Sequence, residues 1–344
     1  MIAYEIEKQD ETLAGAGEAQ SRAARRDTSH LYIQSALLYT TSEGERRIRV
    51  HNMAVPLTNM KHLPFEYLDV TATAHYLARL ALSRLTTNVN FQVCRSTIEM
   101  YLTNLCRSML KSQSNLSNRQ LPENIQYLIM YVLGLLKMPF LSPVGPGGKA
   151  LVTLESLDQI SYLRYLLNNM SPEETLPLYN PWLFNIHDFN LNDQAPPAME
   201  ALDRSLLGRN QLLLCFNGLA VYIYVGRTCD PWFLNELFKV QDFAQVDRHT
   251  GEDELFAVGA YEHSAYLVAL YNIINMQLRA QRQPFCEIRV LTEGDPESDT
   301  TLRSMLVNDA VANPSYNIDF AKFLATITGG SSGGATAAAG GVSG

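Results

Sequence analysis

The order of apolar and polar positions changes character twice along the chain. Residues 31–55 hold two β-rich runs, LYIQSALLYTT and RRIRVHNMAV, on either side of the polar turn Ser42-Glu43-Gly44-Glu45. This arrangement predicts a β-hairpin. From residue 63 the apolar positions follow helical spacing, and from residue 178 strand-like and helix-like stretches alternate.

The middle of the chain predicts an all-α region of four or five amphipathic helices. Leu121-Pro122-Glu123 is expected to open one of these helices with proline near its first position. Ser171-Pro172-Glu173-Glu174 has the spacing of a capping box, in which serine and the second glutamate satisfy each other's backbone groups. The apolar faces that carry the prediction are Ala74/Leu77/Ala78/Ala81/Leu82/Leu85, Ile98/Leu102/Leu105/Met109, Ile125/Leu128/Ile129/Val132/Leu136 and Leu157/Ile160/Leu163/Leu167/Met170.

The following 115 or so residues mix strands and helices, which predicts an α+β module with a sheet packed on helices. A strand is expected over residues 178–188, and a helix over residues 266–281. Asn217-Gly218 predicts a type I′ turn between two strands. Asp230-Pro231 is expected to start a short helix on which Trp232 belongs to the core. Cys286, Ile288 and Val290 alternate as a last strand.

Composition excludes several classes of protein. The chain of 344 residues is 47% hydrophobic and 18% charged, which is typical of globular domains with sizeable cores. A net charge of −8 argues against nucleic acid as a partner. No stretch is long and apolar enough for a membrane span, and the acidic start MIAYEIEKQDETL is unlike a signal peptide. The five cysteines lack metal-ligand spacing and are expected to be buried free thiols.

No motif for catalysis or cofactor binding is found in the sequence. P-loop, GxGxxG, GxSxG and HExxH patterns are absent, so we expect no enzyme activity, no catalytic residue, no cofactor and no metal site. Asp247-Arg248-His249 lies in a polar stretch and is interpreted as a solvated turn.

The second strand of the predicted hairpin is unusually basic. Strand alternation places Arg46, Ile48 and Val50 on one face and Arg47, Arg49 and His51 on the other. Guanidinium groups in such number suit a surface that holds carboxylates or phosphates. The alternative is a solvated face whose arginines pair locally with Glu43 and Glu45.

Four stretches resemble, in order, the Sec24 family, the cargo-adaptor subunits of the COPII vesicle coat. ALLYTTSEGERRIRVHN is similar to the last hairpin of the family's β-sandwich, and LPLYNPWLFNIHDF to the first strand of its gelsolin-like domain. PPAMEALDRSLLGRNQLLLCFNGLAVYIYVGR resembles that domain's linker and central hairpin, and RVLTEGDPESDTTLRSMLVNDAV its closing strand, EGDP turn and helical return.

The resemblance implies a multidomain α+β chain that corresponds to the C-terminal half of such a subunit. The family's trunk and zinc-binding module are not found in these residues. The expected parts are the last strands of an incomplete β-sandwich (residues 1–60), a helical domain (61–175), a gelsolin-like domain (176–292), a C-terminal helical return (293–328) and a disordered Gly/Ser/Ala-rich tail (329–344).

The resemblance also implies a non-catalytic adaptor that selects cargo for transport from the endoplasmic reticulum to the Golgi. Its expected partners are a Sec23-type coat subunit, a Sar1-type GTPase and the cytoplasmic tails of cargo membrane proteins. It would be cytoplasmic, and peripheral on membranes at endoplasmic reticulum exit sites and on COPII vesicles. By position, Arg47 and Arg49, with Arg46 in reserve, are the candidates for binding acidic sorting signals. The alternative is a gelsolin-like protein that regulates actin.

Overall fold

The computed structural model divides the chain into two compact units, Met1–Pro64 and Phe65–Gly344, which are described separately. Within them the structure describes residues 30–58, 60–87, 91–112, 121–138, 141, 157–187, 198–203, 211–257, 264–278, 286–309 and 316–329. Residues 1–29 of the predicted β-sandwich segment and the predicted tail beyond residue 329 lie outside these ranges.

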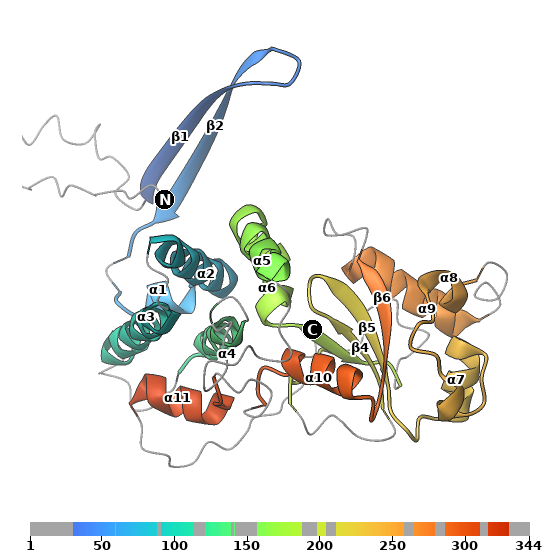
Figure 1. Ribbon diagram of the computed structural model, residues 1–344. Coiled ribbons are helices and arrows are strands. Elements are labelled where there is room, and N and C mark those ends of the chain that lie inside the picture. The colour runs from blue at the N-terminus through green and yellow to red at the C-terminus, as the bar shows by residue number, and fades with distance from the viewer. Residues whose placement is uncertain are drawn as a thin grey trace, which may run out of the picture. The chain divides into compact units, whose positions relative to one another are not determined.

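The described part of the first unit is mainly a long two-stranded ribbon (Figure 1). Strand β1 (His30–Thr40) pairs antiparallel with β2 (Arg46–Pro56), so that Leu37 lies opposite Arg49. The turn is closed by two backbone hydrogen bonds, from Gly44 N–H to the Thr41 carbonyl (3.0 Å) and from Thr41 N–H to the Glu45 carbonyl (2.9 Å). Gly44 has φ +84°, a backbone conformation that suits glycine. The predicted hairpin is therefore confirmed.

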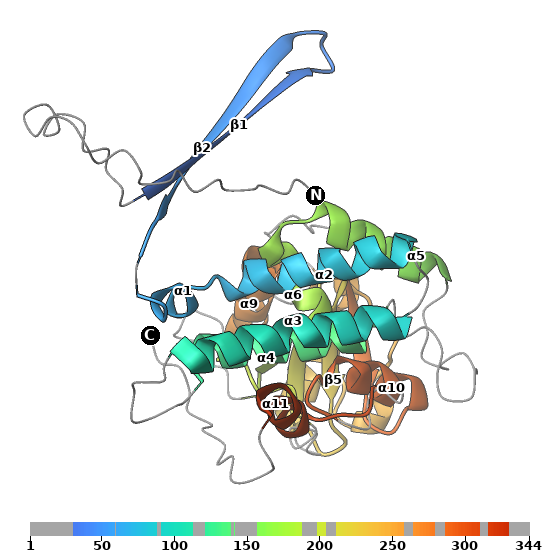
Figure 2. The ribbon, with the colours of Figure 1, turned by 90° about the vertical axis from the view of Figure 1, so that its left-hand side faces the viewer.

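The second unit begins with the predicted all-α layer. Figure 2 shows α2 and α3 side by side, with α4 behind them. The helices are α1 (Leu63–Glu66, which begins in the first unit), α2 (Val70–Thr87), α3 (Phe91–Ser112), α4 (Glu123–Lys137), α5 (Leu157–Asn169) and α6 (Pro172–Tyr179). The capping box at α6 is present: Glu174 N–H donates to Ser171 Oγ (3.4 Å), and Ser171 N–H donates to Glu174 Oε2 (2.8 Å).

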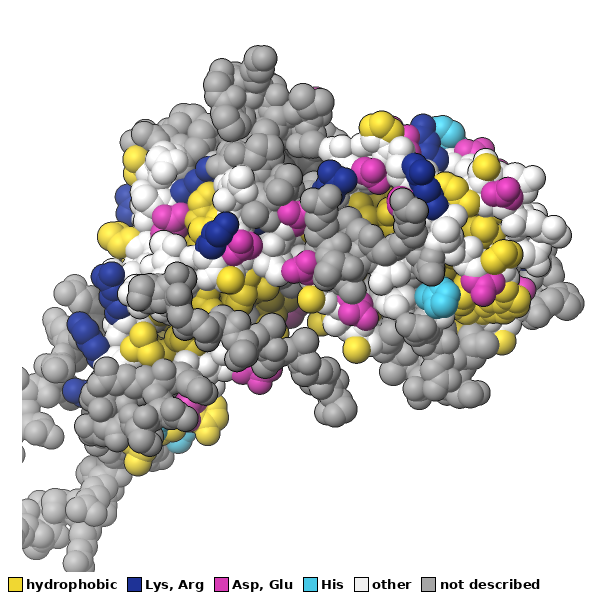
Figure 3. Space-filling view, turned by 90° about the horizontal axis from the view of Figure 1, so that it is seen from below, with side chains coloured by type: hydrophobic (Ala, Val, Ile, Leu, Met, Phe, Trp, Pro, Cys, Tyr) yellow, Lys and Arg dark blue, Asp and Glu magenta, His cyan; other side chains and the backbone are white. Residues whose placement is uncertain are grey.

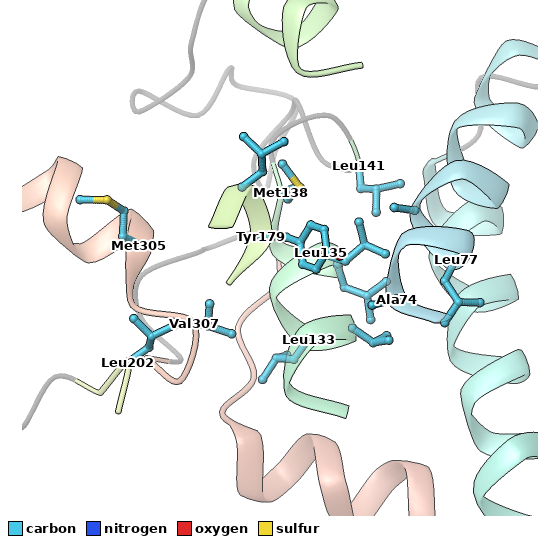
Figure 4. Close-up of a cluster of buried hydrophobic side chains, with 14 of the residues drawn as sticks. Ala74, Leu77, Leu133, Leu135, Met138, Leu141, Tyr179, Leu202, Met305 and Val307 are labelled. Carbon is cyan, nitrogen blue, oxygen red and sulfur yellow. The ribbon is translucent and has the colours of Figure 1, made fainter. Parts of the chain in front are cut away.

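Helix α4 is the centre of this layer, because every residue from Val132 to Lys137 in its second half is buried. Figure 4 shows side chains of α2 (Ala74, Leu77), α4 (Leu133, Leu135) and the end of α6 (Tyr179) converging in one cluster. Helix α4 and the end of α6 approach so closely that a Cβ added at Gly134 would lie 1.8 Å from the Tyr179 carbonyl oxygen. Glycine at this position therefore makes the packing possible.

A four-stranded sheet follows, in the order β3-β4-β5-β6, in which only β5 and β6 run parallel among the described strands. Figure 1 shows α7 and α9 on one side of the sheet and α10 on the other. The elements are β3 (Trp182–Asn185), β4 (Leu212–Phe216), β5 (Ala220–Val225), α7 (Pro231–Phe238), η4 (Phe243–Gln245), α8 (Glu252–Leu255), α9 (Ala265–Asn272), the π-helical turn η6 (Ile273–Leu278), β6 (Glu287–Thr292), α10 (Pro296–Met305) and α11 (Phe320–Thr328).

Both faces of this sheet are buried. Leu212, Leu214 and Ile223 pack on α7 and α9, whereas the alternate residues Leu213, Cys215 and Tyr222 belong to the same hydrophobic core as the helical layer. This explains why β4 and β5 read as continuous apolar runs rather than as alternating ones. The predicted mixed α+β class is confirmed.

Several local predictions were wrong. Leu178 and Tyr179 end helix α6 and do not begin a strand; β3 starts at Trp182. The turn at Asn217-Gly218 is not type I′, because only Gly218 has positive φ; the Asn217 side chain instead accepts from the N–H groups of Leu219 and Ala220, at 3.0 Å each. The helix that follows Asp230 does form as predicted, with the carboxylate as its N-cap.

The position of Trp232 also differs from expectation. The Trp232 side chain is 49% exposed and packs edge-on against Phe233 and Tyr266, so it covers the core instead of entering it. Figure 3 shows hydrophobic side chains interspersed with basic, acidic and histidine side chains on the right-hand part of the viewed face, which holds the sheet and helices α7–α9. The last helix of the predicted helical return starts at Phe320.

The return segment after α10 is anchored to the helical layer by polar contacts. Lys137 Nζ donates to the backbone carbonyls of Val307 (2.6 Å) and Asp309 (3.1 Å). Asn308 Nδ2 donates to Asp203 Oδ2 (2.8 Å), and Tyr316 Oη donates to Glu99 Oε1 (2.5 Å). The Lys137 and Tyr316 contacts hold the described part of the return segment against α4 and α3, although these elements are more than a hundred residues distant in sequence.

Candidate functional site

The register of the ribbon sorts its basic side chains onto two faces. Residues that lie opposite each other point to the same face, so Arg47 (opposite Tyr39) and Arg49 (opposite Leu37) share one face. Arg46 is opposite Thr40 and projects from the other. The register therefore confirms the prediction that the side chains of Arg47 and Arg49 project from the same face.

The two arginines on the shared face have different neighbours. Arg47 Nη2 and Nε donate to Glu45 Oε2 at 2.5 and 3.1 Å, an ion pair whose side chains are both more than half exposed. The guanidinium carbon of Arg49 lies 5.6 Å from the centre of the Tyr39 ring, as in a cation–π contact. Exposed ion pairs contribute little to stability, so the carboxylate on Arg47 is easily exchanged for another.

The interpretation of the basic strand as a solvated face with local carboxylate partners is therefore partly confirmed. Glu45 is the partner of Arg47, as the solvated-face alternative proposed, whereas no described carboxylate pairs with Arg46 or Arg49. Whether these three arginines bind a ligand stays a prediction.

Apolar side chains extend this face beyond the arginines. Leu37 is 60% exposed and Met53 55% exposed, and both lie on the side of the ribbon that carries Arg47 and Arg49. Leu37 and Met53 were not among the predicted site residues, although strand alternation places both on the face of the two arginines. The surface can accept an extended segment that combines carboxylates with an apolar side chain.

The described residues hold no group of three or more His, Cys, Asp and Glu side chains that could bind a metal ion. In the same ranges, no helix is long and apolar enough to cross a bilayer. All five cysteines are buried and free.

The loop that suggested a catalytic cluster is instead structural. Arg248 forms an ion pair with Asp295 Oδ2 (2.7 Å), the residue that caps α10. Asp295 also accepts from Ser298 N–H and Oγ at 2.8 Å, and these bonds hold the pKa of its carboxyl below its usual value. The Asp247 carboxylate accepts from His249 N–H (2.8 Å) and so shapes the predicted turn.

Sequence comparison identifies two family domains. The Sec23/Sec24 β-sandwich domain matches residues 9–58, and the Sec23/Sec24 helical domain matches residues 69–177. The first match includes the basic ribbon, and the second covers α2 to α6.

Curated relatives extend the similarity over most of the chain. It is 25% identical over 304 residues to protein transport protein SEC24 B of Arabidopsis thaliana, and 28% identical over 302 residues to human Sec24A. These alignments cover 86% and 84% of this chain, and 26% of each relative. The chain thus spans about a quarter of the length of these relatives.

The fold matches a solved structure as well. The crystal structure of the human COPII-coat protein Sec24c superposes with a TM-score of 0.71 at 24% identity, over 86% of this chain and 36% of that one. The chain is therefore similar to Sec24 proteins over most of its length, and segments that match the Sec23/Sec24 β-sandwich and helical domains follow one another in that order.

Proposed function

We propose that this protein acts as a non-enzymatic subunit of the COPII coat, a cargo adaptor in vesicle transport from the endoplasmic reticulum to the Golgi. The proposal is supported by the two adjacent Sec23/Sec24 domain matches and by the Sec24 relatives. It works with a Sec23-type subunit and a Sar1-type GTPase on the cytoplasmic side of exit-site membranes.

The observation that carries the cargo-binding part of the proposal is the shared face of Arg47 and Arg49. Two guanidinium groups beside exposed Leu37 and Met53 suit an acidic tail that also contributes an apolar side chain. The carboxylates of the tail bind by charge-assisted hydrogen bonds. Affinity for a single tail is weak, and many tails on one membrane add avidity.

Fluorescence anisotropy tests this surface with a labelled peptide that contains an Asp-x-Glu sequence next to leucine. Arg47→Glu/Arg49→Glu should abolish measurable binding, and binding to the unaltered protein should weaken as salt is raised. Arg46→Glu reverses a charge on the opposite face and should leave affinity within about twofold. Lys239→Glu, far along the sequence, controls for overall charge.

The Glu45 pairing provides an independent variant. Glu45→Gln removes the carboxylate that occupies Arg47, so peptide affinity should rise by about two- to fivefold, the value of one exposed ion pair. Unchanged affinity in both the double arginine variant and Glu45→Gln would remove the ribbon from cargo binding. Actin co-sedimentation tests the gelsolin-like alternative, and pelleting with filaments would favour it.

A further inference from the structure

Helices α2 and α3 carry the opposite charge to the chain as a whole. Together they contain five arginine or lysine residues and a single glutamate, whereas the net charge of the protein is −8. The glutamate, Glu99, accepts a hydrogen bond from Tyr316 Oη and is partly buried under the C-terminal return. The positive charge of the two helices is therefore not balanced by acidic side chains of their own.

The outward stripe of α3 combines apolar and basic side chains. Met100 is 54% exposed, and Arg107 and Lys111 follow it seven and eleven residues later on the same side of the helix. Tyr101, 43% exposed, lies at the edge of this side, about 100° around the helix from Met100. The opposite side of α3 is fully committed to the core through Cys94, Ile98, Leu102, Cys106 and Met109. The stripe thus has no partner among the described elements on its outer side.

Helix α2 adds the same kinds of side chain next to this stripe. Tyr76 is 49% exposed, and Arg79 is exposed one turn further along. No described carboxylate forms an ion pair with Arg79, Arg107 or Lys111. Figure 2 shows the two helices side by side at the surface. From this arrangement and from the exposure of their side chains we infer that the two outward stripes form one face.

We propose that this basic-apolar face, defined by Tyr76, Arg79, Met100, Tyr101, Arg107 and Lys111, binds an acidic amphipathic helix of a partner protein. Two neighbouring helices offer ridges and grooves into which a third helix packs. The apolar stripe of that helix meets Met100, Tyr76 and Tyr101. Its flanking carboxylates meet the three cations, which makes the binding salt-dependent.

A lipid surface fits the same face less well. Polybasic segments that bind anionic membranes carry about four to eight clustered lysines or arginines, and interfacial helices insert Trp, Phe or Leu. The face holds three cations spread over two helices, and its exposed apolar groups are Tyr and Met. The proposed partner is therefore a protein helix.

Fluorescence anisotropy with a labelled peptide of 18 residues tests the proposal. The peptide carries leucine at helical i, i+3, i+4 spacing and glutamate at the flanking positions. We expect saturable binding to the full chain. Arg107→Glu/Lys111→Glu and, separately, Met100→Ser should each weaken it at least about fivefold. The matched control Lys239→Glu/Arg303→Glu reverses two charges on other helices and should leave affinity within about twofold.

Further arms separate this face from the ribbon and from lipid. Arg47→Glu/Arg49→Glu should leave binding of the helical peptide intact, so failure of the cargo proposal and failure of this one are distinguishable. A peptide with glutamine in place of glutamate should not bind. An equal loss of peptide affinity in the control variant would overturn the protein-helix assignment. It would also be overturned if the protein bound only phosphatidylserine vesicles and Arg107→Glu/Lys111→Glu weakened that binding.

Discussion

Single residues decide how closely the elements of the second unit can approach one another. Gly134 permits backbone contact between α4 and the end of α6, and Asn217 shapes its turn through its side chain rather than through positive φ. Apolar periodicity predicted the buried face of α4 at Ile125, Leu128, Ile129, Val132 and Leu136. It could not predict Gly134, because a glycine required for close approach of two backbones resembles any other glycine within a helix.

Gly134→Ala should destabilise the protein by about 2–3 kcal/mol or more, because the new Cβ would overlap backbone atoms of Tyr179 that cannot rotate away. Urea unfolding followed by circular dichroism measures the change. Gly251→Ala is the matched control, since a Cβ there meets nothing within 4 Å, and it should change stability by less than about 0.5 kcal/mol. Equal midpoints for the two variants would contradict this account.

At the scale of elements, the helices were largely predictable from their apolar period and capping residues, and β4 and β5 from their continuous apolar runs on either side of Asn217-Gly218. Ser171, Asp230 and Asp295 all cap the helices that follow them. The ends of elements were less predictable: apolar residues 178 and 179 fit a strand as well as a buried helix end, and tertiary packing selected the helix. The alternation of the basic strand predicted that Arg47 and Arg49 share a face, and the solvated-face alternative already included Glu45 as a local partner. The contact of Arg49 with Tyr39 was not predicted, because it depends on the register between the two strands.

The tie between α4 and the return segment depends on Lys137. Lys137→Met keeps much of the side chain's apolar length but leaves the Val307 and Asp309 carbonyls without this donor, at a cost of about 1–3 kcal/mol. The amides of residues 308 and 309 should exchange hydrogen faster, as measured by mass spectrometry. In the exposed control Lys111→Met, exchange there should match the unaltered protein. Unchanged exchange in both variants would show that the segment is held without Lys137.

Across the whole molecule, buried thiols link stability to pH. Burial raises the pKa of Cys106 and Cys229 to about 11 and that of Cys215 to about 12, from an ordinary value of 9.0. Above pH 9 the unfolded chain loses these protons while the folded chain keeps them. The folded state then binds more protons, so the free energy of unfolding falls as pH rises. Burial lowers the pKa of Lys137 to about 8, so this group raises the free energy of unfolding as pH rises. It is a single group, whereas three thiols lower the free energy of unfolding over the same pH range.

The expected result is a lower urea midpoint at pH 9.5 than at pH 8.0, measured with a reducing agent present. Cys215→Ala removes the most strongly shifted of these thiols, so the decrease between the two pH values should be smaller in this variant than in the unaltered protein. A midpoint that stays constant over this interval would contradict the linkage.

The sheet of the second unit has one further consequence. Its strands β4 and β5 place alternate side chains in two separate cores, and one of those cores also contains α2, α3, α4 and α11. Recombinant expression of residues 65–175 alone, or of residues 176–328 alone, would leave a hydrophobic surface uncovered on each fragment. Both fragments would then aggregate, whereas a polypeptide that runs from residue 65 through residue 329 keeps the shared core buried.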